Sequence, residues 1–420
     1  MTTFFKPAML RSAGLLAGFL CCLSLLSPAP LSAGDKNKKK EQLAETQKQT
    51  ILDDIQQANL VWPAAPAPTR IKYLNYFCCD KYVPTVGKKS SWMDRMAGSE
   101  SNAQRQAEKP LFALWTPNGM VVDSKGTLYV ADGKVGAIFM FNTETKDVQL
   151  IKNGFNARFG DIQGLAMDDS DRLFVSDTKM HRILVFDKNH KTEGQITQHV
   201  ADPGGMAIDN ENRFLYVADA GQDLVLVYDA DKLTFLRQIG IPGKAHTLTE
   251  PGAFAVPTNV AVDADENLYV ADTYNNRIEV FDADGNFIRV WGKAGDRPGT
   301  FMRPKGIAID VDGHVWVADS MQDRVQCFTQ EGLLLMALGS HGEFAGSFQA
   351  LAGLYIDKNN RMFTSEQYPG RVQMFRYFTD DEARAELAKR KAEQDKNKAG
   401  APKPQTNAAP VQSSAAQKPQ

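Results

Sequence analysis

The chain has 420 residues, 43% of them hydrophobic and 23% charged, and its formal net charge at neutral pH is −2. This is the composition of an ordinary globular protein with enough chain for one large core. The charge balance gives no electrostatic reason to expect a nucleic-acid partner, because binding to nucleic acid usually requires a clearly basic face.

Residues 1–33 have the pattern of a secretory signal peptide. Lys6 and Arg11 give a positive start, residues 13–26 form an apolar run, and the segment ends at Ala33 in a helix-breaking stretch. The apolar run is short for a membrane span, so we expect cleavage and no transmembrane domain in the mature protein. The predicted location is the periplasm or the extracellular space.

A second outcome for this segment is lipidation at Cys21 or Cys22, which would attach the exported protein to a membrane. Leu20 precedes Cys21, at a position where a lipidation site requires a small residue. We therefore favour simple export.

Three segments follow the signal peptide. Residues 34–61 are charged with sparse apolar positions, which predicts a spacer with a short helix. Residues 62–77 begin with a proline-rich stretch that excludes a helix or a central strand, but residues 70–77 alternate apolar and polar side chains as a strand does. Residues 78–112 are predicted to form an insertion of loop and short helix.

Residues 113–378 contain six copies of one unit. The best copy, 256–292, has four short alternating runs separated by turns rich in Asp, Asn and Gly, which is the pattern of an antiparallel meander. Its second run ends in an acidic residue that recurs in every copy, at Asp132, Asp177, Asp219, Asp272, Asp319 and Glu366. A period of about 40–50 residues with four strands per repeat is typical of a β-propeller. The predicted fold class is all-β, a six-bladed β-propeller of four-stranded antiparallel blades with helical or disordered extensions at both ends.

The sixth copy lacks a fourth strand, because after residue 377 the sequence changes to a charged run rich in Ala, Glu and Lys. We expect residues 70–77 to supply this outer strand and to close the ring between the two ends of the chain, which removes an exposed sheet edge. Residues 379–399 predict an exposed helix, and residues 400–420 predict a low-complexity, disordered tail.

The repeated unit resembles the NHL repeat. Residues 257–281 and 304–328 match its pattern best, with an apolar strand ending in Asp, then Y-V-A-D or W-V-A-D, then R-I-x-V-F or R-V-x-C-F. The likeness covers residues 117–377. The chain is also similar to secreted bacterial six-bladed NHL-repeat proteins, which often open with a segment like Trp62 to Leu74.

Some copies depart from the NHL pattern. The first has no arginine at 133–137, the third has Leu224 in the arginine position, and the sixth has Thr-Ser-Glu at 364–366 in place of V-A-D. The resemblance implies a binding role, since NHL domains commonly recognise other macromolecules. Some cytoplasmic NHL domains bind RNA, but the predicted export and the slightly acidic balance argue against RNA here.

Strand direction decides which loops lie together. The loops after each second strand, the starts of the first strands and the connectors between copies must share one side, which we call the loop face. The D-A-D-G type turns share the opposite face. Loops that are long and varied, as on the loop face, are where binding usually occurs. The predicted ligand or partner residues on this face are Asn118, Gln163, Lys179, His181, Thr258, Tyr274, Asn275, Lys305 and Gln322. This polar surface suits a protein, peptide or glycan ligand in the cell envelope, although ordinary solvated loops have a similar composition.

Several copies carry an arginine five positions after the acidic residue, as in Asp177 with Arg182 and Asp272 with Arg277. An active site is asymmetric, whereas a pair that recurs in successive blades usually joins a turn to the next strand through charge-assisted hydrogen bonds. We interpret these pairs as structural.

The competing interpretation is a metal-dependent lyase or lactone hydrolase with a site at the central channel. Two propeller groups suggest it: gluconolactonase-like hydrolases hold a divalent ion with Glu, Asp and Asn, and the peptidyl-hydroxyglycine lyase, also built from NHL-type repeats, holds zinc with histidines. The variable first-strand positions carry no carboxylate, and the weak zinc candidates are His181, His246 and His341.

Sequence motifs of other enzyme classes are absent: no nucleophile elbow, P-loop, Cys-x-x-Cys or HExxH motif occurs in the chain. We therefore predict no catalytic residue, metal or cofactor, and we favour an exported, non-catalytic scaffold that binds a protein through the loop face.

Signal cleavage would leave three cysteines. Cys327 replaces a strand valine and is interpreted as a buried apolar side chain. The adjacent Cys78 and Cys79 could form a strained disulfide, bind a soft metal, or do neither. A haem attachment motif, Cys-x-x-Cys-His, is absent.

Overall fold

The computed structural model describes residues 60–64, 66–79, 112–152, 158–242 and 247–400, with side chains to residue 392. The predicted signal peptide, nearly all of the spacer and of the 78–112 insertion, and the tail lie outside the described residues. Among the helices that the structure describes, none has both the length and the apolar character required to cross a membrane.

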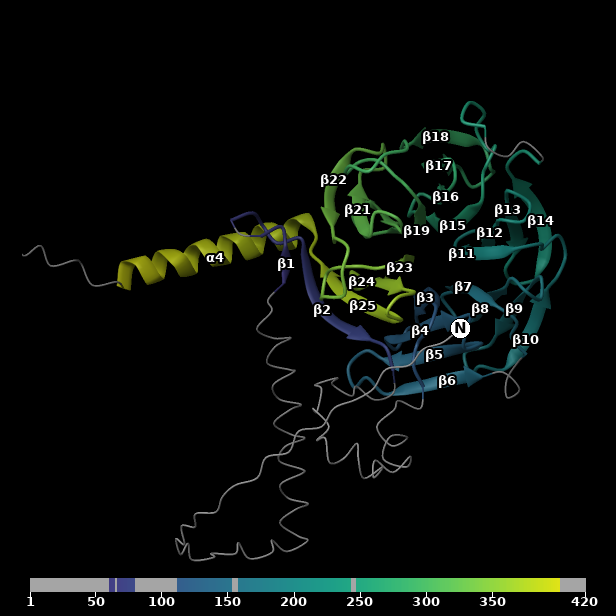
Figure 1. Ribbon diagram of the computed structural model, residues 1–420, viewed down its shortest axis with the longest axis horizontal. Helices are drawn as coiled ribbons and strands as arrows, with labels where there is room; N and C mark the ends of the chain where they lie inside the picture. The colour runs from purple at the N-terminus through teal and green to yellow at the C-terminus, as the bar shows by residue number, and fades with distance from the viewer. Residues whose placement is uncertain (1–59, 65, 80–111, 153–157, 243–246, 401–420) are drawn as a thin grey trace, which may run out of the picture. The chain divides into compact units, whose positions relative to one another are not determined.

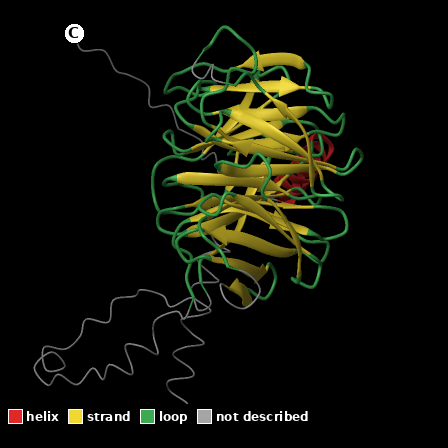
Figure 2. Cartoon of the chain, turned by 90° about the vertical axis from the view of Figure 1, so that its right-hand side faces the viewer, coloured by secondary structure: helices red, strands yellow, loops and turns green. Residues whose placement is uncertain are grey.

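Six antiparallel sheets stand in a ring, with successive sheets following one another in the chain (Figure 1). Seen from the side, the strands of neighbouring sheets stack face to face (Figure 2). The prediction of a six-bladed β-propeller of four-stranded antiparallel blades is confirmed, and the sixth sheet carries one additional strand of two residues at its edge.

The first three blades each run from the inner to the outer strand. Blade 1 has β3 (Pro117–Val122), β4 (Thr127–Asp132), β5 (Ala137–Asn142) and β6 (Val148–Lys152). Blade 2 has β7 (Ile162–Met167), β8 (Leu173–Asp177), β9 (Arg182–Phe186) and β10 (Thr192–Ile196). Blade 3 has β11 (Pro203–Asp209), β12 (Phe214–Asp219), β13 (Leu224–Asp229) and β14 (Thr234–Ile239).

Blades 4 and 5 repeat the order, and blade 6 takes its outer strands from the N-terminal side. Blade 4 has β15 (Pro257–Val262), β16 (Leu268–Asp272), β17 (Arg277–Phe281) and β18 (Phe287–Trp291). Blade 5 has β19 (Pro304–Ile309), β20 (Val315–Asp319), β21 (Arg324–Phe328) and β22 (Leu334–Leu338). Blade 6 has β23 (Leu351–Ile356), β24 (Arg361–Glu366), β25 (Arg371–Tyr377), β2 (Ile71–Phe77) and the two-residue β1 (Val61–Trp62).

Strand β2 lies beside β25, and the two pair antiparallel from Ile71 with Tyr377 to Phe77 with Val372. The last blade is therefore completed by a segment that precedes the first blade in the chain. This pairing closes the ring and removes the edge that β25 would otherwise expose.

The hydrophobic core lies between neighbouring blades. The second and third strands of a blade are covered on both faces, so all five residues of β16 and all five of β17 are buried. The outer strand β18 exposes much of its apolar surface. One core cluster joins blades 3 and 4 and includes Tyr216 and Phe254, and comparable clusters join the other pairs. Burial of this apolar area is the main force that holds the blades together.

Glycines let the inner strands of adjacent blades approach closely. A Cβ on Gly119 would lie 2.6 Å from the backbone nitrogen of Leu165, and one on Gly306 would lie 2.7 Å from that of Leu354. Neither gap can admit a side-chain atom. Five blades have glycine at this inner position, and the fourth has Asn259.

The acidic residue at the end of each second strand stabilises the loop face. Asp219 is fully buried and accepts hydrogen bonds from the backbone nitrogens of Ala201, at 2.7 Å, and Asp202, at 3.0 Å. Equivalent bonds are made by Asp132, Asp177, Asp272, Asp319 and Glu366. These contacts recur in every blade, which supports the structural interpretation of the acidic positions.

Helix α4 (Asp380–Gly400) follows the last strand. Thr379 Oγ1 accepts from the backbone nitrogen of Glu382 at 3.3 Å, and Glu382 Oε2 accepts from that of Thr379 at 3.0 Å. This reciprocal pair is a capping box, which defines where the helix begins. The Arg70 guanidinium also forms an ion pair with Asp380.

Candidate functional site

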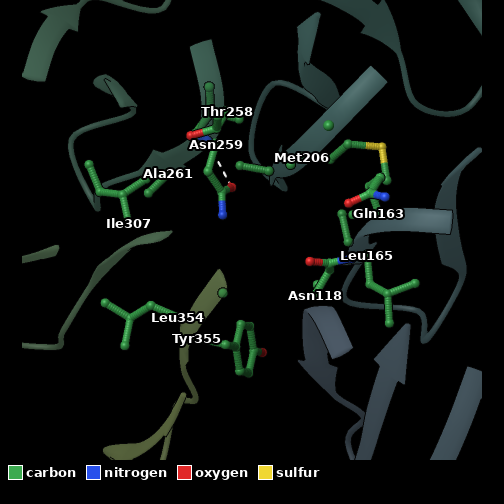
Figure 3. Close-up of a pocket in the computed structure, with 18 of the residues that line it drawn as sticks. Asn118, Gln163, Leu165, Met206, Thr258, Asn259, Ala261, Ile307, Leu354 and Tyr355 are labelled. Carbon is green, nitrogen blue, oxygen red and sulfur yellow. Dashed lines mark hydrogen bonds between the residues drawn. The ribbon is translucent and has the colours of Figure 1, made fainter. Parts of the chain in front are cut away.

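A cavity of about 490 Å³ occupies the centre of the ring and is lined by the inner strands of all six blades (Figure 3). The variable position near the start of each inner strand faces it: Asn118, Gln163, Gly204, Thr258, Lys305 and Ala352. The topology places these positions at the loop-face end of the cavity, which we call the channel mouth.

Amide, hydroxyl and carboxylate groups form hydrogen bonds around the channel mouth. Gln367 Nε2 donates to Asn118 Oδ1 at 2.7 Å, and Gln163 Nε2 donates to Asp161 Oδ1 at 2.9 Å. Thr258 Oγ1 lies 2.7 Å from Thr273 Oγ1. These bonds fix the side chains in place and leave a polar entrance.

Below the channel mouth the cavity lining becomes apolar. Leu165, Met206, Ile307 and Leu354 lie around the space together with the ring of Tyr355 (Figure 3). A polar entrance above an apolar wall is the usual composition of a ligand pocket.

Two charged residues line the cavity along the part of the chain that the structure describes, Asp202 and Lys305. Burial raises the pKa of the Asp202 carboxyl above its usual value, and the nearby Asp219 adds to the shift. Burial lowers the pKa of the Lys305 ammonium below its usual value, and Arg303 adds to that shift. Both shifts favour the neutral form, because a partly enclosed site solvates charge poorly.

Asn259 interrupts the ring of small residues and extends toward the cavity (Figure 3). Its Oδ1 accepts from the backbone nitrogen of Val260 at 2.9 Å. The asparagine fits because residue 205 of the preceding blade is a glycine. A Cβ added to Gly205 would lie 2.9 Å from the Asn259 Cα. The fourth blade therefore contributes an amide where the others contribute only backbone.

Large apolar side chains are exposed on the loop face, in the loops after the second strands and in the connectors between blades. We call this set the apolar rim. Its members are Trp115, Val135, Met180, Leu248, Tyr274, Met302, Met321, Phe344 and Tyr368.

Apart from Tyr274, the apolar rim was missed by the sequence analysis, which otherwise considered the polar residues of the loops. A signal for it existed, because Val135, Met180, Tyr274, Met321 and Tyr368 all follow the acidic end of a second strand within three residues.

The structure distributes the predicted site residues among three settings. Asn118, Gln163, Thr258 and Lys305 line the channel mouth, as described above. Lys179 and His181 are exposed on one loop, and His181 Nδ1 contacts the carbonyl oxygen of Ala201. Tyr274 is 47% exposed, with the Arg303 guanidinium 3.8 Å from its ring centre.

Two predicted contact residues are instead used within the protein. Asn275 is buried, and its Nδ2 donates to Asp272 Oδ2 at 2.7 Å and to Ala253 O at 3.1 Å. Gln322 Nε2 donates to the carbonyl oxygens of Gly295 and Thr300, both at 2.9 Å. Asn275 is therefore a turn-stabilising residue and not a contact residue, because its amide is enclosed.

The three candidate zinc histidines have separate settings. His341 Nδ1 lies 2.6 Å from Asp323 Oδ2, and its Nε2 lies 3.1 Å from Gln349 Nε2. His181 Nδ1 contacts the carbonyl oxygen of Ala201, and His246 lies outside the described residues.

A group of three potential metal-binding side chains is present at the opposite face, among the residues that the structure describes. It consists of Asp310, Asp312 and His314, in the turn between β19 and β20. Asp310 already accepts from the backbone nitrogens of Asp312 and His314 and from Trp316 Nε1. Equivalent aspartates support the same turn in other blades, including Asp263 and Asp357, so a structural role accounts for Asp310.

Comparisons with known proteins agree with this architecture. The profile of a family described as a 6-bladed beta-propeller matches residues 156–251 and 256–328. A protein of unknown function from Bacteroides thetaiotaomicron superposes with a TM-score of 0.51 at 15% identity, over 63% of this chain and 70% of that one.

Two curated proteins match parts of the chain. Peptidyl-glycine alpha-amidating monooxygenase B of Xenopus laevis is 30% identical over 174 residues, covering 33% of this chain and 19% of that protein. Protein brain tumor of Drosophila melanogaster is 46% identical over 46 residues, covering 11% of this chain and 4% of that protein. The chain thus spans less than a fifth of the length of either relative.

Proposed function

We propose that this chain, which is an NHL-type six-bladed β-propeller, is an exported, non-catalytic scaffold that binds a protein partner through its loop face. The observation that carries the proposal is the apolar rim. Trp115, Tyr368 and Met321 are 66%, 58% and 57% exposed. Aromatic and methionine side chains are enriched in protein interfaces, and tryptophan and tyrosine often supply most of the binding energy.

The composition of the apolar rim favours a protein partner over a small ligand. Met180, Met302 and Met321 are flexible side chains that adapt to an irregular surface. Tyr274 and Arg303 add a cation–π pair that presents both an apolar ring and a positive charge. The channel mouth, with its fixed amides, would then accept a polar group that projects from the partner's surface.

Site-specific photo-crosslinking in cells tests this proposal. A photoreactive residue at Met321 or Met180 should give one adduct of defined mass, and the same residue at Leu335 is the matched control. Leu335 is 49% exposed, but it lies on the outer strand β22. The adduct should weaken in Trp115→Ala and Tyr274→Ala variants. The same adduct from Leu335, or none from the loop face, would contradict the proposal.

The export part of the proposal rests on residues 1–33. Protein recovered from the cell envelope should begin at Gly34 when its N-terminus is sequenced. Recovery of the chain from the cytoplasm with its N-terminal segment intact would contradict export while leaving the binding proposal open to its own test.

The enzyme alternative has one structural observation in its favour. The cavity is of ligand size. Its lining includes the acid Asp202 and the base Lys305, and the pKa shift of each group favours its neutral form. One curated relative is named for an activity on peptidyl-glycine. Elemental analysis of the dialysed protein separates the two candidates: one metal per chain that is lost in a His341→Ala or His246→Ala variant would favour the enzyme.

A further inference from the structure

Two adjacent cysteines lie where β2 leaves the sixth blade. Cys78 and Cys79 directly follow Phe77, the last residue of β2, and their sulfur atoms are 2.6 Å apart. Backbone contacts join the pair to the segment that leads into the first blade. Leu114 N donates to Cys78 O at 2.7 Å, and Cys79 forms an isolated β-bridge with Ala113.

The pair is partly buried between the first and sixth blades. The positive charges of Lys146, from blade 1, and Arg371, from blade 6, act to lower the pKa of the Cys78 thiol. The hydrogen bond with Cys79 and then burial outweigh them, so the net pKa of Cys78 is raised. In the reduced protein the hydrogen bond to Cys79 is therefore the largest influence on the Cys78 thiol.

Cys327 is a natural reference within the same chain. It is 2% exposed in strand β21, packed in the core between blades 5 and 6, and burial raises the pKa of its thiol. A reagent in solution reaches this sulfur only if the propeller opens.

We propose that Cys78 and Cys79 are a reversible redox site, which a disulfide-bearing oxidant converts to a vicinal disulfide and a thiol reductant restores. In the forward step one cysteine thiol loses its proton to solvent and attacks the oxidant's disulfide as the thiolate, which forms a mixed disulfide and releases one thiolate of the oxidant. The second cysteine thiolate then displaces the other oxidant sulfur and forms the bond between the two cysteines. The pair loses two protons and two electrons, and the oxidant gains them as two thiols.

Reversibility follows from the adjacency of the two residues. Neighbouring Cα atoms are about 3.8 Å apart, whereas disulfides usually join Cα atoms about 4.4–6.8 Å apart. A bridge between neighbours is therefore strained and is reduced more easily than a structural disulfide. It also closes almost no loop, so stabilisation of the fold does not account for it. This site is additional to the proposed binding function and does not depend on it.

Differential alkylation of the full chain tests the redox site. The protein is equilibrated in glutathione buffers of graded oxidised-to-reduced ratio, quenched in acid, alkylated after unfolding and measured by mass spectrometry. The peptide that contains Cys78 and Cys79 should pass from doubly alkylated to unalkylated and lighter by two hydrogen atoms, with no stable singly alkylated form. Cys327 should stay reduced at every ratio. Two independent glutathione adducts on the pair, or two thiols at the most oxidising ratio, would overturn the proposal.

Single variants test the exchange step. Cys78→Ser and Cys79→Ser should each leave one sulfur that accumulates as a mixed disulfide with glutathione where the wild-type chain forms its bridge, and Cys327→Ala should behave as the wild type. Phenylarsine oxide, which binds two neighbouring thiols at once, gives a second readout. With Cys21 and Cys22 replaced by serine, so that they add no second pair, the reduced chain should bind one equivalent, and Cys78→Ser or Cys79→Ser should lose this binding. Equal binding by wild type and serine variants would contradict the proposal.

Discussion

Arg277 donates from Nε to Asp272 Oδ2 at 2.8 Å, and its Nη2 forms a 2.6 Å ion pair with Glu279 Oε1. All three side chains are buried. The same guanidinium also donates to the carbonyl oxygens of Thr247 and Leu248 in the connector before blade 4. One cation thus stabilises two carboxylates and a long connector at the loop face.

Arg277→Ala should lower the free energy of unfolding by about 3–5 kcal/mol, because it leaves buried carboxylates without their partner. Arg182→Ala is the matched comparison, since the Arg182–Asp177 pair is longer, at 3.6 Å, and its arginine is more exposed. We expect a clearly smaller loss there. Urea unfolding of both variants measures the difference, and equal losses would show that burial of the pair does not set its contribution.

Glu279→Gln should remove a pH dependence of stability. Burial raises the pKa of Glu279 to about 6 from an ordinary value of 4.5. The native state therefore holds this proton more tightly than the unfolded state, so the contribution to stability is full below the unfolded pKa and declines as pH rises between the two values.

Blades 5 and 6 show that glutamine fits at this position. Gln326 and Gln373 are the equivalent residues. Gln326 accepts a hydrogen bond from the backbone nitrogen of Gly299 at 2.7 Å, and Gln373 accepts one from that of Gly346 at 2.9 Å. Glu279 accepts the corresponding bond from the backbone nitrogen of Gly252. At pH 7, Glu279→Gln should raise the free energy of unfolding by about 1–2 kcal/mol. Urea titrations between pH 4.5 and 7.5 measure the free energy of unfolding of both proteins. If the variant still loses stability with rising pH as the wild type does, Glu279 is excluded as the source of that loss.

His314 contributes a second pH dependence, at higher pH. The hydrogen bond to Asp310 raises the pKa of His314 above 6.5, with burial opposing it and the charges of Asp310 and Asp312 adding to it. The stabilising contribution is therefore complete below the unfolded pKa and is lost as pH rises through the raised native value. His314→Asn should flatten the stability profile above pH 6.5. NMR titration of the wild-type imidazole checks the direction, and a pKa below 6.5 would contradict it.

The contact between Gly205 and Asn259 predicts a coupled pair of mutations. Gly205→Ala should lower the free energy of unfolding by about 1–3 kcal/mol, because the new methyl group overlaps the Asn259 side chain and backbone. Adding Asn259→Gly should recover part of this loss, and the double-mutant cycle should give a favourable coupling energy. Additive effects would show that the two residues do not compete for the same space.

The architecture was predictable because each blade repeats the same local signals. Alternating strands, Asp-rich turns and the fixed acidic position gave six sheets in the correct order, and the missing strand after Tyr377 indicated that residues 70–77 would pair there. The channel mouth followed from strand direction alone, which places Asn118 and Lys305 at the same end of the cavity.

The details of the candidate site were less predictable, because side-chain exposure depends on loop geometry. Asn275 and its neighbour Tyr274 are adjacent in one turn, yet the first is buried against Asp272 and the second is 47% exposed. Polarity suggested the asparagine as a contact residue, although hydrogen bonds to the turn enclose it. Position after the second strand marks five members of the apolar rim in the sequence, but which of these side chains are exposed emerged only from the three-dimensional arrangement.

The pairing of β2 with β25 also fixes the order in which the protein can be completed during synthesis. Residues 71–77 leave the ribosome before any blade exists, and their partners, residues 372–377, leave it after five blades have been made. A nascent chain that stops short of β25 has a strand with no partner at one end and an unfinished sheet at the other. Completion of the ring therefore requires that translation has passed the last repeat, and a chain truncated before β25 retains an open sheet edge.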